Sequence, residues 1–258
     1  MKKEYDVKKF YNDVSRNYSD HENRLCDKIL DFFIKKNILQ KFRKKGLDIL
    51  DAGGGIGRFS WELSKKNDVV LSDISSGMIK KAKVYFNKNG GESVEFFEES
   101  VTEMKHSDKS FDVVLMMNAI LDYCGDHKKA ISEAHRVLKS GGLFIGSVNN
   151  RLIYCLNHEF KNKNFSLFKK TIETGNRKIE WGKTERSHMT HEFLLSELRS
   201  VLEKKFRKVK IIGPFSIVGK YKKYSKNESL CVFDIQVKYA ENPDFILKSD
   251  DFMFVAEK

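Results

Sequence analysis

A short run of glycines, placed directly after a stretch of apolar residues, constrains the fold of this chain more than any other feature. The segment reads Leu50-Asp51-Ala52-Gly53-Gly54-Gly55-Ile56-Gly57. Glycines after a buried strand let the backbone turn sharply and approach a ligand that a Cβ atom would keep away. The run therefore predicts a strand, a tight loop and a helix. Dinucleotide sites and phosphate loops also use this device, so the run alone does not name the ligand.

Three details narrow the choice of ligand. A dinucleotide-binding loop that starts at Gly53 would place its third glycine at position 58, where this chain has Arg58. The segment also lacks the Gly-Lys-Ser/Thr ending of a phosphate-binding loop. Asp51 ends the predicted strand, and its carboxylate would repel a pyrophosphate but attract an ammonium group. These residues favour a ligand with a cationic amino-acid part.

Strand and helix patterns alternate on both sides of this loop. Strands are predicted at residues 47–51, 69–72, 94–98, 111–117, 143–148, 209–212 and 252–255. Helices are predicted at residues 5–19, 24–45, 56–66, 76–89, 127–138, 191–205 and 230–239. Such alternation requires a parallel sheet with helices on both faces, so the predicted fold class is α/β.

A second acidic residue closes the next predicted strand. Asp73 lies about twenty residues beyond the loop, where an acid accepts both hydroxyls of a ribose. An aspartate at a strand end is by itself more often a helix cap or a solvated residue. Together with Asp51 and the glycines, Asp73 completes a nucleoside-binding arrangement. Ser76 is predicted to cap the helix that follows.

These motifs resemble those of class I S-adenosylmethionine-dependent methyltransferases, in particular the small-molecule enzymes of ubiquinone and menaquinone biosynthesis. LDAGGGIG resembles the first motif of the family and VVLSDIS the second, while SFDVVLMMNAI and RVLKSGGLFIGSV resemble later segments. FYNDVSRNYSD is similar to the family's N-terminal helix and FMFVAEK to its antiparallel last strand. The resemblance implies a Rossmann-like, seven-stranded, mostly parallel sheet whose last strand is antiparallel.

The resemblance also implies where the cofactor S-adenosylmethionine binds. Its methionine part lies near Asp51, Gly53 and Gly55, and its ribose hydroxyls lie on Asp73. Ser100 stands where the family often has an aspartate that contacts the adenine amine, so the chain departs from the pattern there. The other implied contacts are Ile74, Met78 and Val101 around the adenine, and Asn118 and Ala119 beside the methyl group.

Two tyrosines of the N-terminal region are further candidates. Tyr11 and Tyr18 either cover the cofactor, with an aromatic face suited to a sulfonium cation, or only pack the N-terminal helix. The sequence favours neither interpretation.

Methyl transfer from a sulfonium needs an acceptor held in line with the methyl group, and a general base only where the acceptor carries a proton. Tyr123 follows the fourth predicted strand and His188 ends an inserted segment, and these two are the preferred bases. His158, His191 and Asp122 are further candidates, and each is more often structural. The sequence predicts no metal site.

Four parts of the chain are predicted. They are N-terminal helices over the cofactor site (1–46), the cofactor-binding core (47–148), an inserted cap (149–190) and the C-terminal part of the core sheet (191–258). Aromatic residues of the cap either line a pocket or form the cap's own core. They are Tyr154, Phe160, Phe165, Phe168 and Trp181.

The leading hypothesis is methylation of an oxygen or nitrogen atom of a small molecule by in-line displacement. A net charge of +12, with many lysines in residues 199–226, leaves a ribonucleic acid methyltransferase as an alternative. A cofactor-binding module without activity is a third reading. Four isolated cysteines and the lack of a signal or membrane segment predict a reduced, cytoplasmic protein with no membrane partner.

Overall fold

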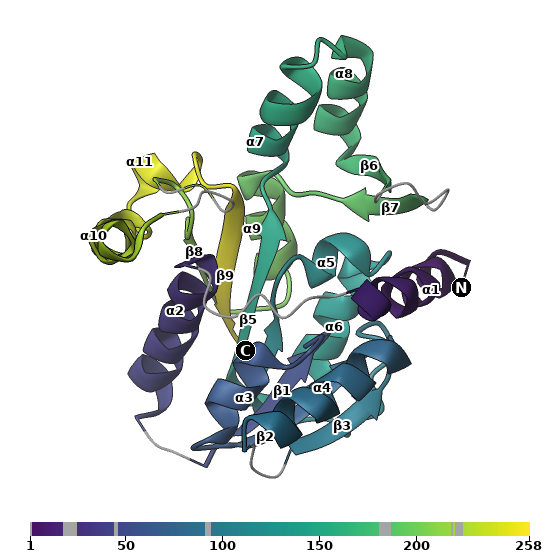
Figure 1. The fold of residues 1–258 in the computed structure, drawn as a ribbon, viewed down its shortest axis with the longest axis vertical. Helices are drawn as coiled ribbons and strands as arrows, with labels where there is room; N and C mark the ends of the chain where they lie inside the picture. The colour runs from purple at the N-terminus through teal and green to yellow at the C-terminus, as the bar shows by residue number, and fades with distance from the viewer. Residues whose placement is uncertain are drawn as a thin grey trace.

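The computed structural model describes residues 2–17, 25–43, 46–90, 94–180, 187–217, 219 and 224–258. Its centre is a seven-stranded sheet with the strand order β3-β2-β1-β4-β5-β9-β8 (Figure 1). Only β9 runs antiparallel to its two neighbours, β5 and β8. This confirms the predicted Rossmann-like α/β fold. The strands are β1 (Asp48–Ala52), β2 (Asp68–Asp73), β3 (Val94–Glu98), β4 (Phe111–Met116), β5 (Leu138–Asn149), β8 (Lys208–Ile212) and β9 (Asp251–Glu257).

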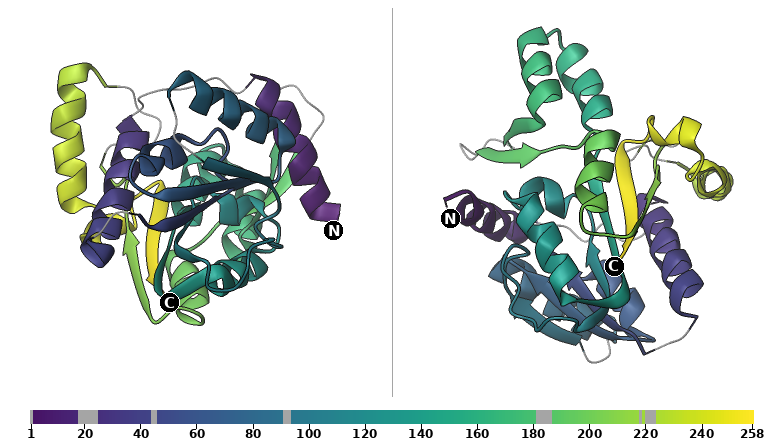
Figure 2. Two further views of the ribbon diagram at one scale, coloured as in Figure 1. Left: turned by 90° about the horizontal axis from the view of Figure 1, so that it is seen from below. Right: turned by 180° about the vertical axis from the view of Figure 1, so that it is seen from behind.

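Helices cover both faces of this sheet, because the central strands carry apolar residues on both sides (Figure 2). Ile49 and Val113 pack in one buried cluster with α2 and α3. Leu50 and Val114 pack in the other with α6 and α9. The helices of these layers are α2 (Leu25–Phe42), α3 (Arg58–Ser64), α4 (Ser76–Lys88), α6 (His127–Val137), α9 (Leu195–Glu203) and α10 (Lys226–Tyr239).

Three predicted helix starts are corrected by the structure. Ser75, and not Ser76, caps α4, because Ser75 is still extended and its hydroxyl accepts a hydrogen bond from the Met78 amide at 3.1 Å. His191 ends a strand instead of opening a helix, and α9 begins only at Leu195. The helix predicted from residue 230 begins at residue 226, where Ser225 and Glu228 form a reciprocal cap.

A segment between β5 and α9 rises from the sheet and is called here the protruding segment, residues 151–191 (Figure 1). Two strands of this segment pair with each other in antiparallel orientation. The sequence pattern did not predict this pair, and it placed the start of a helix at residue 191, where the second of the two strands ends. None of the helices in the described ranges is long and apolar enough to cross a membrane. The segment contains α7 (Arg151–Cys155), a π-helix (Leu156–Phe160), α8 (Phe165–Thr174), β6 (Asn176–Glu180) and β7 (Ser187–His191).

Candidate active site

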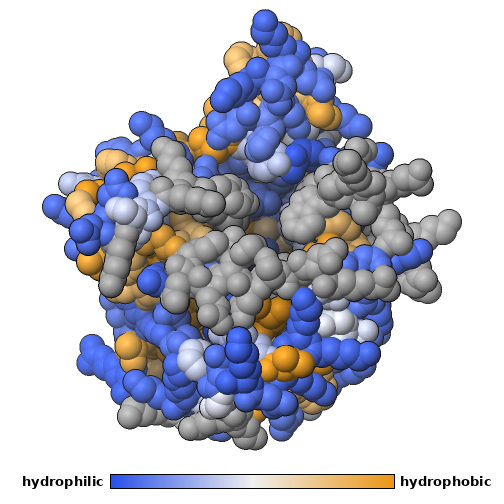
Figure 3. All heavy atoms as spheres, in the orientation of Figure 1, coloured by the Kyte–Doolittle hydropathy of each residue, from blue (hydrophilic) through white to orange (hydrophobic). Residues whose placement is uncertain are grey.

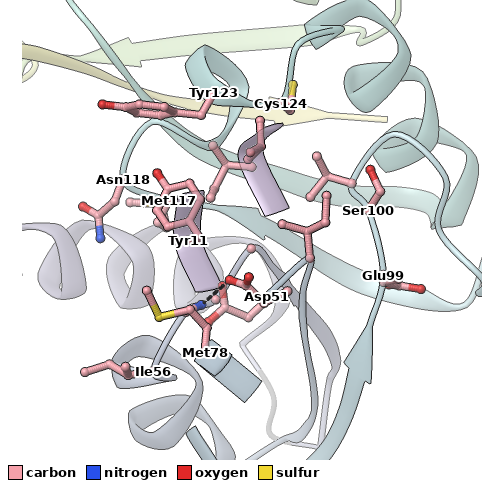
Figure 4. Close-up of a pocket in the computed structure, with 18 of the residues that line it drawn as sticks. Tyr11, Asp51, Ile56, Met78, Glu99, Ser100, Met117, Asn118, Tyr123 and Cys124 are labelled. Atoms are coloured by element: carbon pink, nitrogen blue, oxygen red, sulfur yellow. Dashed lines mark hydrogen bonds between the residues drawn. The ribbon is translucent and has the colours of Figure 1, made fainter. Parts of the chain in front are cut away.

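A pocket opens at the carboxyl ends of β1, β2 and β4, where the strand order reverses direction and parallel sheets bind their ligands. The space that atoms leave empty there amounts to about 1010 Å³, including space open to solvent. Its lining residues are Val7, Tyr11, Asp51, Gly53, Gly54, Gly55, Ile56, Arg58, Phe59, Asp73, Ile74, Met78, Glu99, Ser100, Val101, Met117, Asn118, Ile120, Tyr123 and Cys124 (Figure 4).

The glycine loop forms the floor of this pocket. Gly53 has a φ of 77°, and a Cβ atom there would come within 2.5 Å of the Ile120 side chain. The amides of Gly53 and Gly54 both donate to the carbonyl oxygen of Ser72, at 2.7 and 3.0 Å. These bonds fix the loop against the end of β2. The predicted turn therefore lies where Gly53 and Gly55 can approach a ligand closely.

Asp73 lies at the end of β2 and faces the same loop. One carboxylate oxygen accepts a hydrogen bond from the Gly55 amide at 3.0 Å, and the other accepts one from the Ser75 amide at 2.8 Å. Burial raises the pKa of Asp73 to about 6, although both hydrogen bonds act in the opposite direction. The carboxylate is thus held rigidly by neutral donors at the wall of the pocket.

Asp51 ends the neighbouring strand β1 and is almost fully buried. Its carboxylate accepts a hydrogen bond from the Ser60 hydroxyl at 2.5 Å. Burial raises the pKa of Asp51 to about 6, and the nearby Asp73 carboxylate adds to this effect. Neither aspartate forms an ion pair with another residue in the described ranges. Two desolvated carboxylates therefore share one pocket without a cation between them.

The predicted adenine contacts all line the pocket. Ile74, Met78 and Val101 supply apolar side chains, and Ser100 lines the pocket beside them. The Ser100 hydroxyl accepts a hydrogen bond from the Thr102 amide at 3.1 Å, so it also stabilises its own turn. Glu99, the preceding residue, lines the pocket too and lies 3.0 Å from His106. An acid is present after β3, one position before the place where the family pattern has it.

Helix α1 (Lys2–Asn17) covers the pocket mouth and contributes Tyr11 to its lining. The helix is fixed to the start of α4, because the Asn12 side chain accepts hydrogen bonds from the Ser75 hydroxyl at 2.7 Å and the Gly77 amide at 3.1 Å. Tyr18, the second predicted tyrosine, lies outside the described residues.

The chain turns abruptly after β4 at Asn118 and Ala119. Both residues are in the left-handed region, with φ values of 58° and 67°, which is unusual for residues other than glycine. The Asn118 amide donates to the Ser147 hydroxyl at 2.8 Å, and the Ala119 amide donates to the Ser147 carbonyl oxygen at 3.0 Å. Asn118 lines the pocket, whereas Ala119 does not, because the turn directs it into the core.

The two preferred base candidates occupy different positions. Tyr123, in α5 (Ile120–Tyr123), lines the pocket, and its ring lies 6.2 Å from that of Tyr11. His188 does not line the pocket but stacks on the Tyr123 ring at 5.9 Å. The His188 Nε2 atom lies 3.1 Å from the Tyr123 carbonyl oxygen, so Nε2 carries the proton and donates it. Figure 4 shows Tyr11 and Tyr123 across the pocket from Asp51.

The other three base candidates do not line this pocket. Asp122 is buried and accepts a hydrogen bond from the Asn149 amide at 3.0 Å. His158 stacks on Tyr154 at 4.1 Å in a second hollow, and His191 bonds to Glu197 at 2.7 Å. The side chains of these three residues thus lie outside the pocket.

Arg58 also lines the pocket. In the sequence it served only as evidence against a dinucleotide-binding loop. It opens α3, and its guanidinium donates to the Asp27 carboxylate of α2 at 2.6 Å. Its position directly after the glycine loop is the sequence feature that could have placed it in the pocket. Val7, by contrast, reaches the pocket only through the docking of α1, which no local pattern encodes. No group of three possible metal ligands occurs among the described residues.

The four aromatic residues predicted for the cap that the structure describes do not line this pocket. Phe160 contacts Phe165 and Phe168 at the far end of the protruding segment, and Tyr154 lines the second hollow. Trp181 lies outside the described residues. In the basic region, Arg207 bonds to Glu257, and Lys210 bonds to Glu241. The lysines at 220, 222 and 223 also lie outside the described residues.

Residues 49–142 match the family model described as a methyltransferase domain. This span carries the glycine loop, both buried aspartates and the turn after β4. The chain therefore contains a methyltransferase domain, with the motifs and the fold of the class I S-adenosylmethionine-dependent methyltransferases. S-adenosylmethionine is the cofactor of this class, and the predicted recognition of the family is confirmed.

Relatives of this methyltransferase domain cover its core. An uncharacterized protein from Methanocaldococcus jannaschii is 31% identical over 165 residues, which are 64% of this chain and 59% of the relative. A ubiquinone/menaquinone biosynthesis C-methyltransferase from Rickettsia prowazekii is 30% identical over 152 residues, 56% of this chain and 60% of the relative. In both cases the match spans about three fifths of the relative's length.

A solved structure shows the same fold as the methyltransferase domain. The S-adenosylmethionine-dependent methyltransferase from Methanosarcina mazei superposes with a TM-score of 0.60 at 23% identity, over 86% of this chain and 96% of the other. At this identity the likeness supports the fold.

Proposed function

We propose that the chain transfers the methyl group of S-adenosylmethionine to an oxygen or nitrogen atom of a small-molecule acceptor. The observation that carries the proposal is the pair of buried carboxylates, Asp51 and Asp73, beside the glycine loop in one pocket. Buried charges normally have a partner, and these two have none among the described cations. A ligand with hydroxyl groups and a cationic part would supply what they lack.

Asp73 fits the ribose of the cofactor. A carboxylate offers about four lone-pair sites, and the amides of Gly55 and Ser75 take one on each oxygen. One site on each oxygen therefore stays open, and two neighbouring hydroxyls can donate to them. Ile74, Met78 and Val101 provide the apolar wall that a purine ring needs.

Asp51 and Arg58 fit the amino-acid end of the cofactor. Asp51 would attract the ammonium group, which would compensate for the cost of burying its carboxylate. Arg58 would hold the carboxylate group, and Asp27 already orients the guanidinium from behind. The two opposite charges at the two ends of the loop match the two charges of an amino acid.

The cofactor supplies an already activated methyl group, so the chain must mainly position the acceptor and exclude water. We assign these tasks to Tyr11 and Tyr123, whose rings meet edge to face over the pocket. The Tyr123 hydroxyl is the proposed base for a protonated acceptor. His188 is a positioning residue, because its Nε2–H group donates to the Tyr123 carbonyl oxygen and fixes α5. The protruding segment is the proposed cap, within the four-part division given above.

The test is turnover of S-adenosylmethionine by the purified chain with a library of small hydroxyl and amine compounds. The proposal predicts that some compounds raise the release of S-adenosylhomocysteine, and that Tyr123→Phe lowers kcat for hydroxyl acceptors by about a hundredfold. Asp73→Asn should lower kcat/KM for S-adenosylmethionine by about a hundredfold with every acceptor. Binding of the cofactor without turnover on any compound would overturn the catalytic proposal, while turnover on ribonucleic acid alone would favour the alternative acceptor.

A further inference from the structure

The far end of the protruding segment exposes a cluster of phenylalanines. We call residues 156–170 the aromatic tip; they comprise the π-helix, the turn after it and the first half of α8. Phe160 is 50% exposed and Phe165 is 54% exposed, although their ring centres lie only 5.4 Å apart. Leu156 and Leu167 are also exposed. The cluster is therefore open to solvent and is not the closed core of a cap.

The exposed charged side chains of the aromatic tip are all lysines. The tip carries four exposed lysines, and none forms an ion pair with another described residue: Lys161, Lys163, Lys169 and Lys170. The one acid of the tip, Glu159, is buried and accepts a hydrogen bond from the Thr171 hydroxyl at 3.0 Å. Any partner of this surface thus meets exposed apolar rings together with positive charge that no described acid compensates.

The aromatic tip is a formed structure and not a frayed loop. The Asn164 amide donates to the Glu159 carbonyl oxygen at 2.8 Å, and the Lys163 amide donates to the Phe160 carbonyl oxygen at 2.9 Å. Figure 1 places the turn at the end of the segment most distant from the sheet, and Figure 3 shows apolar groups among hydrophilic ones there. The rings are consequently presented outward in a fixed arrangement.

We propose that the aromatic tip docks on an anionic lipid membrane surface, with Phe160 and Phe165 in the boundary between headgroups and acyl chains. Exposed Phe and Leu beside Lys, without acids, is the pattern of segments that lie in a membrane interface. The lysines add attraction to anionic headgroups, which neutral lipid lacks. This contact spans no membrane, and it stands independently of the proposed methyl transfer.

Three features favour lipid over a nucleic acid strand. Base stacking uses aromatic faces that are free and flat, whereas Phe160 meets Phe165 and Phe168 at steep angles of 70° and 63°. The exposed leucines gain from acyl chains but offer little to a base. Lysines without an arginine also suit a diffuse layer of headgroups better than ordered phosphate contacts.

The experiment measures flotation of the full chain with vesicles of phosphatidylcholine, with and without phosphatidylglycerol. The chain should bind only the anionic vesicles, weakly and reversibly, since one apolar cluster plus one basic cluster gives modest affinity. Phe160→Ser with Phe165→Ser should lower the partition coefficient by at least about tenfold. Lys161→Gln with Lys163→Gln should lower it by about tenfold at low salt.

Matched controls separate the aromatic tip from the general basic charge of the chain. Leu39→Ser with Val84→Ser removes two exposed apolar residues elsewhere, and Lys204→Gln with Lys205→Gln removes two exposed lysines. Both should bind within about twofold of the unmodified chain. In addition, a Phe165→Trp variant should show fluorescence quenched by lipids with brominated chains.

Several outcomes would overturn the proposal. They are failure of the unmodified chain to bind anionic vesicles, tip variants that bind as well as it does, and control lysines whose loss has the same effect. Tip-dependent binding of a labelled ribonucleic acid strand without vesicle binding would assign the surface to nucleic acid instead. Thermal unfolding curves establish that each variant is folded.

Discussion

The pocket and the root of the protruding segment both contain buried charged groups, but the hydrogen-bond partners of these groups differ. We call Arg151, Arg177 and Glu192 the root. In the pocket, Asp51 and Asp73 accept hydrogen bonds only from neutral groups. At the root, Arg151 is 4% exposed and donates to the carbonyl oxygen of Glu192, at 2.7 and 2.9 Å. The Glu192 side chain in turn lies 3.1 Å from the Arg177 guanidinium.

This difference separates charge that holds the fold from charge that can hold a ligand. Burial raises the pKa of Glu192 to about 7 and that of both pocket aspartates to about 6, so a raised pKa alone does not mark the site. The partners do. At the root, cations and carbonyl oxygens satisfy one another within the chain. In the pocket, the ammonium group of the proposed cofactor would supply a cation that the described residues do not.

The largest expected effect is on stability, at the root. Arg151→Met removes the donors to the Glu192 and Ile172 carbonyl oxygens and the partner of Glu197. We expect the free energy of unfolding to fall by about 3–5 kcal/mol, because two carbonyl oxygens and the Glu197 carboxylate all lose a buried charged donor. Urea unfolding measures this, with exposed Arg199→Met as the control. The affinity for S-adenosylhomocysteine should stay nearly unchanged. A comparable loss of affinity would show that the root and the pocket do not act independently.

The second effect is on cofactor affinity, in the pocket. Asp73→Asn removes a charged acceptor for two hydroxyls, so the Kd for S-adenosylhomocysteine should rise about a hundredfold. Calorimetric titration provides the value. Asp68→Asn, at the exposed opposite end of the same strand, is the matched control and should bind normally. Equal affinities for the two variants would refute the ribose assignment.

The pH dependence of stability and of cofactor binding also distinguishes the pocket from the root. Burial raises the pKa of Asp51 from 3.8 to about 6, so between these values the folded chain binds protons that the unfolded chain has lost. The stability of the free protein should therefore fall as the pH rises through this window. Affinity for the cationic cofactor should instead rise about tenfold from pH 5 to 7. Asp51→Asn should reduce this rise and leave the part that Asp73, with its similar pKa of about 6, contributes, while Glu192→Gln should keep the rise unchanged.

The smallest effect is expected at His188, between the two regions. His188→Gln keeps a donor near the Tyr123 carbonyl oxygen but loses the ring stacked on Tyr123. We expect kcat to fall about fivefold with an unchanged KM for the cofactor. Steady-state kinetics over a range of pH checks this. A shift of the pH profile that follows His188 would show that the imidazole itself transfers the proton.

Local motifs predicted the sheet, its order of elements and most of the pocket. The glycine loop, Asp73 and the strand ends lie within short segments whose conformation depends mainly on neighbouring residues. Asn118 and Ala119 were expected as a pair, yet only Asn118 reaches the pocket, because two successive left-handed residues turn Ala119 inward. No sequence pattern signals that backbone conformation for these residue types.

Contacts between distant segments account for what the sequence did not reveal. The β6–β7 pairing at residues 176–180 and 187–191 depends on the protruding segment folding back on itself. Arg58 gains its role from Asp27, 31 positions away. The exposure of Phe160 and Phe165 was also hidden, because phenylalanines at helical spacing normally predict a buried face.

We propose that the pocket beside Asp51 and Asp73 binds S-adenosylmethionine, and a crystal structure with S-adenosylhomocysteine would show this directly. We expect both ribose hydroxyls within hydrogen-bonding distance of the Asp73 carboxylate, and the amino-acid end at Gly53 to Gly55, between Asp51 and Arg58. A nucleoside bound at any other place, with Asp73 solvated or bonded only to the chain, would contradict it.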